Sequence, residues 1–150
     1  MIIKPLSVAQ MQVEGKVLLD EHYEELTQHK EIVKLDVDWA KYEMLEKTGV
    51  CQAWGAWEEE QLIGYVVFFV IPHLHYKSNI FASNDVLFLK KSHRLGMTGI
   101  RLIRHAEKEL SKNGPVKVVW HVKPETTLEV LLDHFGYTYE ESKMSKILGA

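Results

Sequence analysis

The apolar residues of this chain recur at two different spacings, and the spacing changes along the sequence. From residue 8 to about residue 30 they recur every three or four positions, which predicts an amphipathic helix. Ser7 and Gln10 have the spacing of a capping box at the start of this helix. Gly15 lies inside it, so we expect the helix to bend or split there.

A second helix follows, and then the spacing changes to that of strands. Asp36 or Asp38 can cap this helix, and Gly49 suits the left-handed position after its last turn. Residues 50–71 are rich in aromatic and β-branched side chains, and the polar residues 58–61 interrupt them. This pattern predicts an antiparallel hairpin that the two helices cover.

The second half of the chain alternates strands with helices. We expect a polar loop at 72–79, a strand at 80–89, and a third helix that ends at Asn113-Gly114-Pro115. A strand at 116–122 follows. Thr126 and Glu129 then have the spacing of a second capping box, for a helix that ends near Gly136. Residues 137–148 are expected to form a last strand or strand pair.

Composition and charge narrow the class of protein. A chain of 150 residues, 46% hydrophobic and 26% charged, is expected to fold as one domain over residues 1–150. Its net charge of −3 provides no broad positive field for nucleic acid. The apolar run at 62–72 is too short to span a bilayer, and the first ten residues lack a signal-peptide core. We therefore expect a cytoplasmic protein that does not bind a membrane.

Cysteine and histidine usage argues against disulfide and metal chemistry. The single cysteine, Cys51, excludes an intramolecular disulfide and a multi-cysteine zinc site. It lies in a strand-like run without a paired histidine, which favours a buried, unreactive thiol over a nucleophile. His73 and His75 form an H-x-H pair, but no third ligand has convincing spacing, so no metal is expected.

The segment SHRLGMTGIRLI at 92–103 joins a predicted strand to a predicted helix through two glycines. The first amides of a helix are unpaired and carry partial positive charge, so such a turn can bind an anion. Gly96 and Gly99 allow close approach, and basic residues surround them: Lys90, Lys91, His93, Arg94 and Arg101. The alternative is a tight turn without a ligand. The motifs of nucleoside-triphosphate loops and of dinucleotide folds are both absent.

Residues 84–109, NDVLFLKKSHRLGMTGIRLIRHAEKE, resemble the acetyl-CoA-binding core of the GNAT superfamily of N-acetyltransferases. The family pattern is Gln or Arg, two free positions, Gly, one free position, and Gly or Ala. In the best register His93 stands first, Gly96 fourth and Thr98 sixth, so two positions depart from the pattern. Within the superfamily, FFVIPHLHY followed by NDVLFL resembles the compact proteins encoded by phages and prophages.

The resemblance covers almost the whole order of elements and implies a fold. That fold is α/β (mixed α+β) and GNAT-like: a mostly antiparallel twisted sheet with one parallel, splayed strand pair and helices on both faces. Acetyl-CoA would be the co-substrate, with its pyrophosphate on the turn and its pantetheine arm paired to the motif strand. The resemblance assigns this binding to Leu87, Phe88, Leu89, Arg94, Leu95, Gly96, Met97, Thr98, Gly99 and Arg101.

Direct transfer of the acetyl group to an amine requires a base near the splayed strands. Asp85 is one candidate, because strand alternation gives it the parity of Leu87 and Leu89. The other candidates are His73 and His75, in the loop before that strand, and His121, at the end of the strand opposite. For each of them a purely structural role is the alternative.

The resemblance also exposes one departure that bears on activity. Many members of the family carry a tyrosine on the last helix as the acid that protonates the CoA thiolate. Leu132 occupies that position here, five residues before Tyr137, so the usual acid is missing. Tyr137 and Tyr139 are expected to pack against the sheet rather than to replace it.

The leading hypothesis is an acetyl-CoA-dependent N-acetyltransferase whose acceptor is a small-molecule or protein amine. Leu132 supports a second one, a catalytically degenerate CoA-binding or structural GNAT-fold protein of phage or prophage origin. Nucleic-acid binding through the basic face of the third predicted helix is a third hypothesis. A solvated helix face explains those basic residues better: Arg101, Arg104, His105 and Lys108. Many members dimerise through their sheets, so a homodimer is one expectation.

Aromatic residues of the predicted hairpin fit two roles. Trp54, Trp57 and the run at 65–69 can line an acceptor pocket. Aromatic stripes on a central hairpin more often form core, and we expect packing to be their main role.

Overall fold

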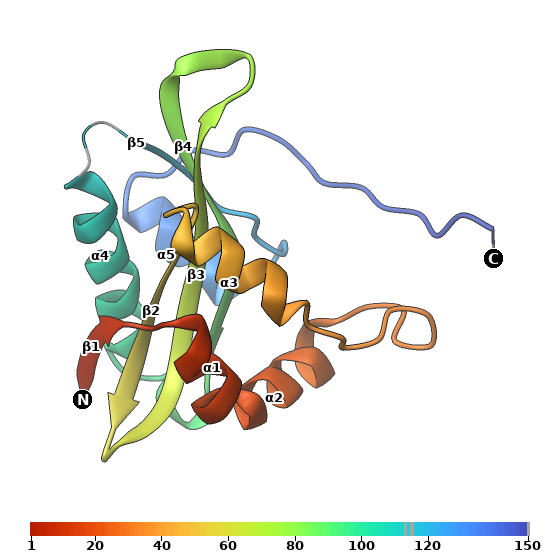
Figure 1. The fold of residues 1–150 in the computed structure, drawn as a ribbon, viewed down its shortest axis with the longest axis vertical. Coiled ribbons are helices and arrows are strands. Elements are labelled where there is room, and N and C mark those ends of the chain that lie inside the picture. The colour runs from red at the N-terminus through yellow and green to blue at the C-terminus, as the bar shows by residue number, and fades with distance from the viewer. Residues whose placement is uncertain (113, 115, 150) are drawn as a thin grey trace.

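The computed structural model describes residues 1–112, 114 and 116–149, and it contains one five-stranded sheet with the strand order β1-β2-β3-β4-β5 (Figure 1). The strands are β1 (Ile2–Pro5), β2 (Cys51–Glu58), β3 (Gln61–His73), β4 (Tyr76–Leu89) and β5 (Val116–Val119). The helices are α1 (Val8–Glu14), α2 (Lys16–Leu26), α3 (Trp39–Lys47), the 3-10 turn η1 (Lys91–His93), α4 (Thr98–Ser111) and α5 (Thr127–His134).

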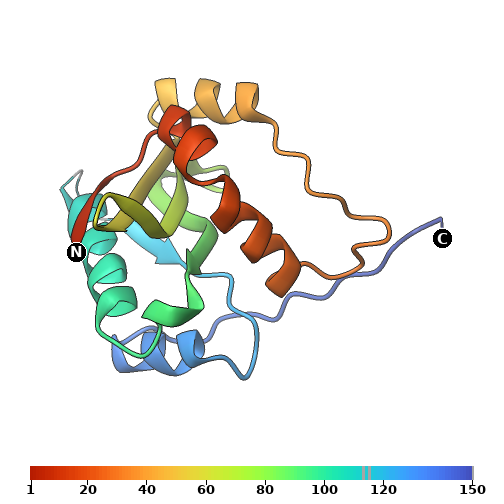
Figure 2. The ribbon, with the colours of Figure 1, turned by 90° about the horizontal axis from the view of Figure 1, so that it is seen from below.

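Neighbouring strands are antiparallel except for β4 and β5, which run parallel. Helices α1 to α3 cover one face of the sheet, and α4 packs on the other, as the end-on view in Figure 2 shows. Each face has its own apolar core, one built around Tyr65 and Phe88 and the other around Phe68 and Leu102. The predicted mixed α/β fold is therefore confirmed, with helices on both faces and one parallel strand pair.

The N-terminal helix splits at Gly15, as the sequence predicts, and ends at Leu26. The capping box is formed: Gln10 N donates to Ser7 Oγ (3.1 Å) and Ser7 N donates to Gln10 Oε1 (3.0 Å). Of the two aspartates considered for the next helix, Asp38 caps α3 by accepting from Lys41 N. Among the described residues, no helix is both long enough and apolar enough to cross a membrane.

The predicted loop at 72–79 is wrong, because both strands continue through it. β3 extends to His73 and β4 begins at Tyr76, so only a two-residue turn joins them. Stacking explains the extension: the His73 ring lies 4.9 Å from the Tyr76 ring and 4.5 Å from the Phe81 ring, between centroids. Such aromatic pairs stabilise cross-strand pairing that polarity alone argues against.

The edges of the sheet also differ from the sequence-based expectation. β1 was not predicted, and it pairs along β2, with Pro5 on an outer strand where a missing N–H is tolerated. β5 ends at Val119 rather than at residue 122, because its pairing with β4 ends there. Residues 137–148 form no strand, and Figure 1 shows them running away from the sheet. Their side chains are largely exposed, so no apolar face drives them onto it.

The second capping box is also wrong in detail. Thr126 precedes α5 without a side-chain cap, and its hydroxyl donates instead to Lys123 O. The Glu129 carboxylate accepts from Glu125 N (2.9 Å), one residue earlier than a capping box requires. Of the predicted stop at 113–115, Asn113 and Pro115 lie outside the described residues.

Two glycines provide a test of how tightly the sheet fits around β4. A Cβ on Gly64 would lie 2.7 Å from Leu89 Cδ1 and 3.0 Å from Phe88 O, whereas a Cβ on Gly96 would meet no atom within 4 Å. We expect Gly64→Ala to lower the free energy of unfolding by about 1–3 kcal/mol. The matched variant Gly96→Ala should change it by less than about 0.5 kcal/mol. Urea unfolding of both variants measures this, and equal stabilities would contradict the packing described.

Candidate active site

Strand β4 contains one extra residue, Asp85, opposite β3. Val86 pairs with Val67 and Asn84 pairs with Phe68, so two steps on β4 match one step on β3. This is a β-bulge, which turns two successive side chains to the same face. Val86 packs into the core under α1 to α3, and the Asp85 carboxylate accepts a hydrogen bond from the Tyr42 hydroxyl of α3.

The bulge corrects one prediction about Asp85. Strand alternation predicts that it shares the parity of Leu87 and Leu89, but the extra residue reverses that relation. Leu87 packs against the core on the α4 side, whereas Asp85 reaches Tyr42 on the α3 side. The carboxylate therefore faces the helices of the N-terminal half.

The parallel strands separate immediately beside this bulge. Pairing between β4 and β5 covers only Ile80 to Ser83 on β4. At the next position the buried Asn84 side chain bridges the widening gap, because its Oδ1 accepts from His121 N at 2.5 Å. Beyond Asn84, β4 continues to Leu89 and pairs only with β3 among the described strands. The predicted splay is therefore present, and one edge of β4 is open there.

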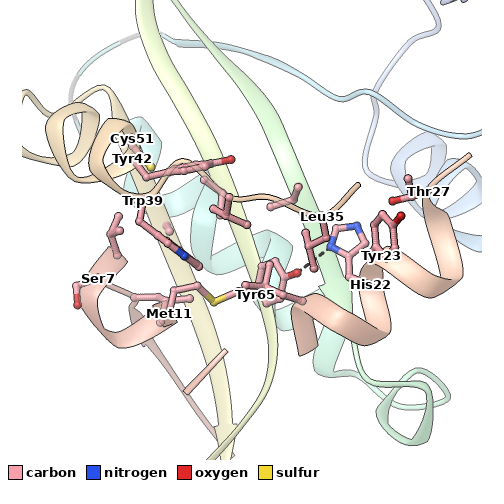
Figure 3. A pocket seen from close by; sticks show the side chains of 17 residues that line it. Ser7, Met11, His22, Tyr23, Thr27, Leu35, Trp39, Tyr42, Cys51 and Tyr65 are labelled. Atoms are coloured by element: carbon pink, nitrogen blue, oxygen red, sulfur yellow. Dashed lines mark hydrogen bonds between the residues drawn. The ribbon is translucent and has the colours of Figure 1, made fainter. Parts of the chain in front are cut away.

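A cavity of about 260 Å³ lies between the sheet and helices α1 to α3 (Figure 3). Its wall includes residues of β2, β3 and β4 and of the segment 27–38 that joins α2 to α3. It reaches β4 at Val86, next to the bulge. The lining residues are Leu6, Ser7, Val8, Met11, Leu19, His22, Tyr23, Thr27, Leu35, Val37, Trp39, Tyr42, Cys51, Ala53, Tyr65, Val67 and Val86.

Polar side chains of this wall make two hydrogen bonds, one of them to Asp85, which does not itself line the cavity. Tyr42 donates to Asp85, and the Tyr65 hydroxyl lies 2.7 Å from His22 Nδ1, a pair drawn with a dashed line in Figure 3. Burial, together with the nearby Asp85 charge, raises the pKa of both phenols well above its usual range. Burial also lowers the pKa of His22. At neutral pH both tyrosines and the histidine are therefore uncharged.

Cys51 lies in the same wall as a buried free thiol. Burial, with smaller contributions from the Glu46 and Asp85 carboxylates, raises its pKa to about 11. The thiol is therefore protonated at neutral pH, which agrees with the predicted unreactive cysteine.

The glycine turn between β4 and α4 leaves the start of the helix accessible. Met97 precedes α4 without a side-chain cap, so the first amides of α4 have no partner within the helix. Space beside Gly96 is open, and Leu95 is fully exposed. Thr98, Gly99 and Arg101 form the first turn of α4, and Arg101 is exposed.

Side chains of the turn tie it to the rest of the molecule. Arg94 donates through Nε to Leu89 O (2.7 Å) and through both terminal nitrogens to the Glu25 carboxylate of α2 (2.6 and 2.8 Å). Donation from Arg94 lowers the pKa of Glu25. His93 Nε2 lies 2.9 Å from Glu58 Oε2. The Arg94 guanidinium is thus paired with Glu25. Through this pair and the bond to Leu89 O, Arg94 holds the turn in place.

The other predicted base residues lie in different places. His73 and His75 are at the tip of the β3–β4 hairpin, near Tyr76. The His73 ring packs against Phe81, which still pairs with β5 and is four residues before Asp85 on β4, about 13 Å along a strand. The structure therefore does not bring these histidines to the splay, whereas it brings His121 beside Asn84. No group of three potential metal ligands occurs among the described residues.

The residues considered above as the proton donor to CoA, and the tryptophans of the hairpin, mostly make packing contacts and hydrogen bonds within the fold. Leu132 is buried. Tyr137 meets Trp120 in an edge-to-face contact and donates to Glu107 (2.8 Å), and its pKa is raised to about 12 chiefly by burial. Tyr139 is exposed rather than packed on the sheet. Trp54 belongs to the core on the α4 side, and the Trp57 indole donates to Glu14 (2.7 Å).

Sequence reasoning missed the roles of His22 and Tyr42. Both lie at helical spacing on α2 and α3, where the sequence signals only a buried stripe. Nothing in either helix shows that its partner is a residue of the sheet 43 positions away, Tyr65 for His22 and Asp85 for Tyr42.

Solved structures with a similar arrangement include several acetyltransferases. A GCN5-related N-acetyltransferase from Ralstonia eutropha JMP134 matches with a TM-score of 0.77 at 18% identity, over 99% of both chains. A ribosomal-protein-alanine N-acetyltransferase from Brucella melitensis biovar Abortus 2308 matches with a TM-score of 0.69 at 17% identity, over 98% of this chain and 99% of that one. An aminoglycoside acetyltransferase from an uncultured soil metagenomic sample matches with a TM-score of 0.72 at 16% identity, over 99% and 98%.

These likenesses establish the fold. No family model and no curated protein matches the sequence. The chain has the fold of the GCN5-related N-acetyltransferases, the GNAT superfamily that the 84–109 segment resembles. The more specific resemblance to phage-encoded members stays a prediction.

The buried His22 makes stability depend on pH. Its pKa is lower in the folded protein than the ordinary 6.5, so the unfolded chain binds more protons below that value and stability falls as the pH falls through it. His22→Gln removes this dependence. We expect the free energy of unfolding to fall less between about pH 7 and about pH 5 in His22→Gln than in the wild type.

Urea unfolding at both pH values measures the difference. His75→Gln, at an exposed histidine, is the matched control and should keep the wild-type dependence. An identical fall in all three proteins would show that the His22 imidazole is not buried as described.

Proposed function

We propose that this protein is an N-acetyltransferase that transfers the acetyl group of acetyl-CoA to a primary amine held in the cavity under α1 to α3. The observation that carries the proposal is the bulge at Asp85. Asp85 lies on the part of β4 whose edge is open, next to Val86, where the cavity reaches the strand. Its carboxylate therefore lies between the proposed acetyl-CoA site and the cavity proposed for the amine. The GNAT fold supports the same function.

The residues of the turn and of β4 fit the co-substrate. The uncapped start of α4 and the open space at Gly96 suit a pyrophosphate, and the open edge of β4 suits the amide groups of a pantetheine arm. When bound, acetyl-CoA supplies an acyl thioester. We assign its binding to Leu87, Phe88, Leu89, Arg94, Leu95, Gly96, Met97, Thr98, Gly99 and Arg101, with the Arg94 side chain positioning the turn through Glu25.

The reaction requires two proton movements on the amine nitrogen. One proton leaves the ammonium, the neutral nitrogen forms a bond to the thioester carbonyl carbon, the carbon–sulfur bond breaks, and the nitrogen loses a second proton. One of these protons reaches the CoA thiolate and the other reaches solvent. Asp85 is the proposed base, acting directly or through one water, and Tyr42 orients its carboxylate by donating to it.

Other candidates have weaker support. His121 lies beside the splay through Asn84 and is the second candidate for the base. His73 and His75 are given no step, since they lie at the hairpin tip. Leu132 offers no proton, but the Tyr65 phenol stays protonated in the same cavity and is the candidate donor. Leu132 also favours a second candidate function, CoA binding without transfer.

Binding of acetyl-CoA tests the first half of the proposal. Gly96→Trp places an indole in open space beside the turn, so it should leave the fold intact and reduce affinity for acetyl-CoA by at least about 100-fold. Gly96→Ala should bind like the wild type. Calorimetric titration measures all three, and tight binding to Gly96→Trp, or no binding to the wild type, would contradict the proposed site.

Substitution of the proposed base tests the second half. Asp85→Asn should lower kcat by about 10²–10⁴-fold, while leaving acetyl-CoA affinity unchanged. Tyr42→Phe should lower kcat less, since the carboxylate remains. Release of free thiol with a panel of primary amines measures these rates. If His121→Gln abolishes activity and Asp85→Asn does not, the base is His121.

A further inference from the structure

The cavity under α1 to α3 has a strongly asymmetric chemistry. Most of its wall is aliphatic or aromatic, and no aspartate, glutamate, lysine or arginine lines it. The Ser7 hydroxyl is occupied by the capping box, and the imidazole of His22 by Tyr65. Asp85 does not line the cavity, but its carboxylate accepts a hydrogen bond from Tyr42, which does. The Tyr42 end of the cavity therefore leads to a carboxylate, whereas most of the remaining wall is apolar.

The segment 27–38, which joins α2 to α3, forms part of the cavity wall. Residues 27–38 contain no regular helix or strand, and Leu35 and Val37 of this segment line the cavity. The Tyr23 hydroxyl donates to Val33 O (2.8 Å) and fixes the segment over α2. A cavity roofed in this way accepts a small molecule more readily than an extended polypeptide.

We infer that the acceptor is a small primary amine with one positive charge and a compact aromatic or branched aliphatic body. This inference rests on the proposed function and adds the substrate class to it. The ammonium lies toward Asp85, at the end of the cavity that meets the splay, and the apolar body fills the space between Met11, Trp39 and Tyr65.

Size and polarity exclude the other amine classes. Pockets for drug-sized ligands measure about 300–1,000 Å³, so a cavity of about 260 Å³ takes a smaller molecule. A polyamine would bury a second ammonium without a counter-ion, and an aminoglycoside would bury hydroxyls without partners. An arylalkylamine has neither defect, because its only polar group is the amine.

Calorimetry and thiol release on the full chain test this inference with 2-phenylethylamine as the probe. Spermidine, an aminoglycoside and a lysine-containing peptide serve as competing classes, and 2-phenylethanol tests the need for the charge. Val37→Trp fills the cavity from the roof segment. Ile32→Trp is its matched control, since Ile32 lies in the same segment, is exposed, and does not line the cavity.

With acetyl-CoA bound, we expect saturable binding of 2-phenylethylamine and none of 2-phenylethanol. Its kcat/KM should exceed that of each competing class by at least about 100-fold, since each leaves a buried polar group unpaired. Val37→Trp should lower it by at least about 10-fold, while Ile32→Trp should have little effect. Acetyl-CoA affinity should be the same in both variants.

Contrary results separate the inference from the function on which it rests. If acetyl-CoA binds and a polyamine, aminoglycoside or lysine peptide is the better acceptor, the substrate class is wrong and the proposed function stands. If acetyl-CoA binds but 2-phenylethylamine neither binds nor reacts, the inference is also wrong. If acetyl-CoA does not bind, the proposed function fails and the inference fails with it.

Discussion

The geometry of this molecule depends on one inserted residue in β4. Because Asp85 has no counterpart on β3, the strand twists more strongly there, and its side chains after the bulge alternate in the opposite sense from those before it. Pairing with β5 stops just before this point, and Asn84 bridges the gap to His121. One position in β4 therefore determines three features: where the edge of the strand becomes open, where the parallel strands separate, and which way the Asp85 carboxylate points.

Burial determines which side chains near Asp85 carry a charge. Tyr42 and Tyr65 keep their protons because the folded chain removes their hydroxyls from water, and His22 stays neutral for the same reason. The Asp85 carboxylate accepts a hydrogen bond from one of these protonated phenols, that of Tyr42. On the other side, Glu25 and Glu58 occupy the side chains of Arg94 and His93, so the turn offers chiefly backbone amides to an anion.

The sequence was informative where a local pattern determines the structure. The capping box at Ser7, the split at Gly15 and the glycine turn before α4 all depend on residues within one or two turns of each other, and each was predicted correctly. The bulge depends on register against β3, so simple alternation gave Asp85 the wrong face. The cavity joins residues 43 positions apart, a relation that helical spacing in α2 and α3 does not carry. At 72–79, aromatic stacking between His73, Tyr76 and Phe81 outweighed a polar composition.

Amide hydrogen exchange with and without acetyl-CoA tests the central claim most directly, namely that the co-substrate occupies the open edge of β4 and the turn before α4. The account predicts slower exchange on binding at residues 86–100, with the hairpin tip at 73–76 unchanged. Protection that falls on the hairpin tip or the C-terminal segment, with none at 86–100, would contradict it.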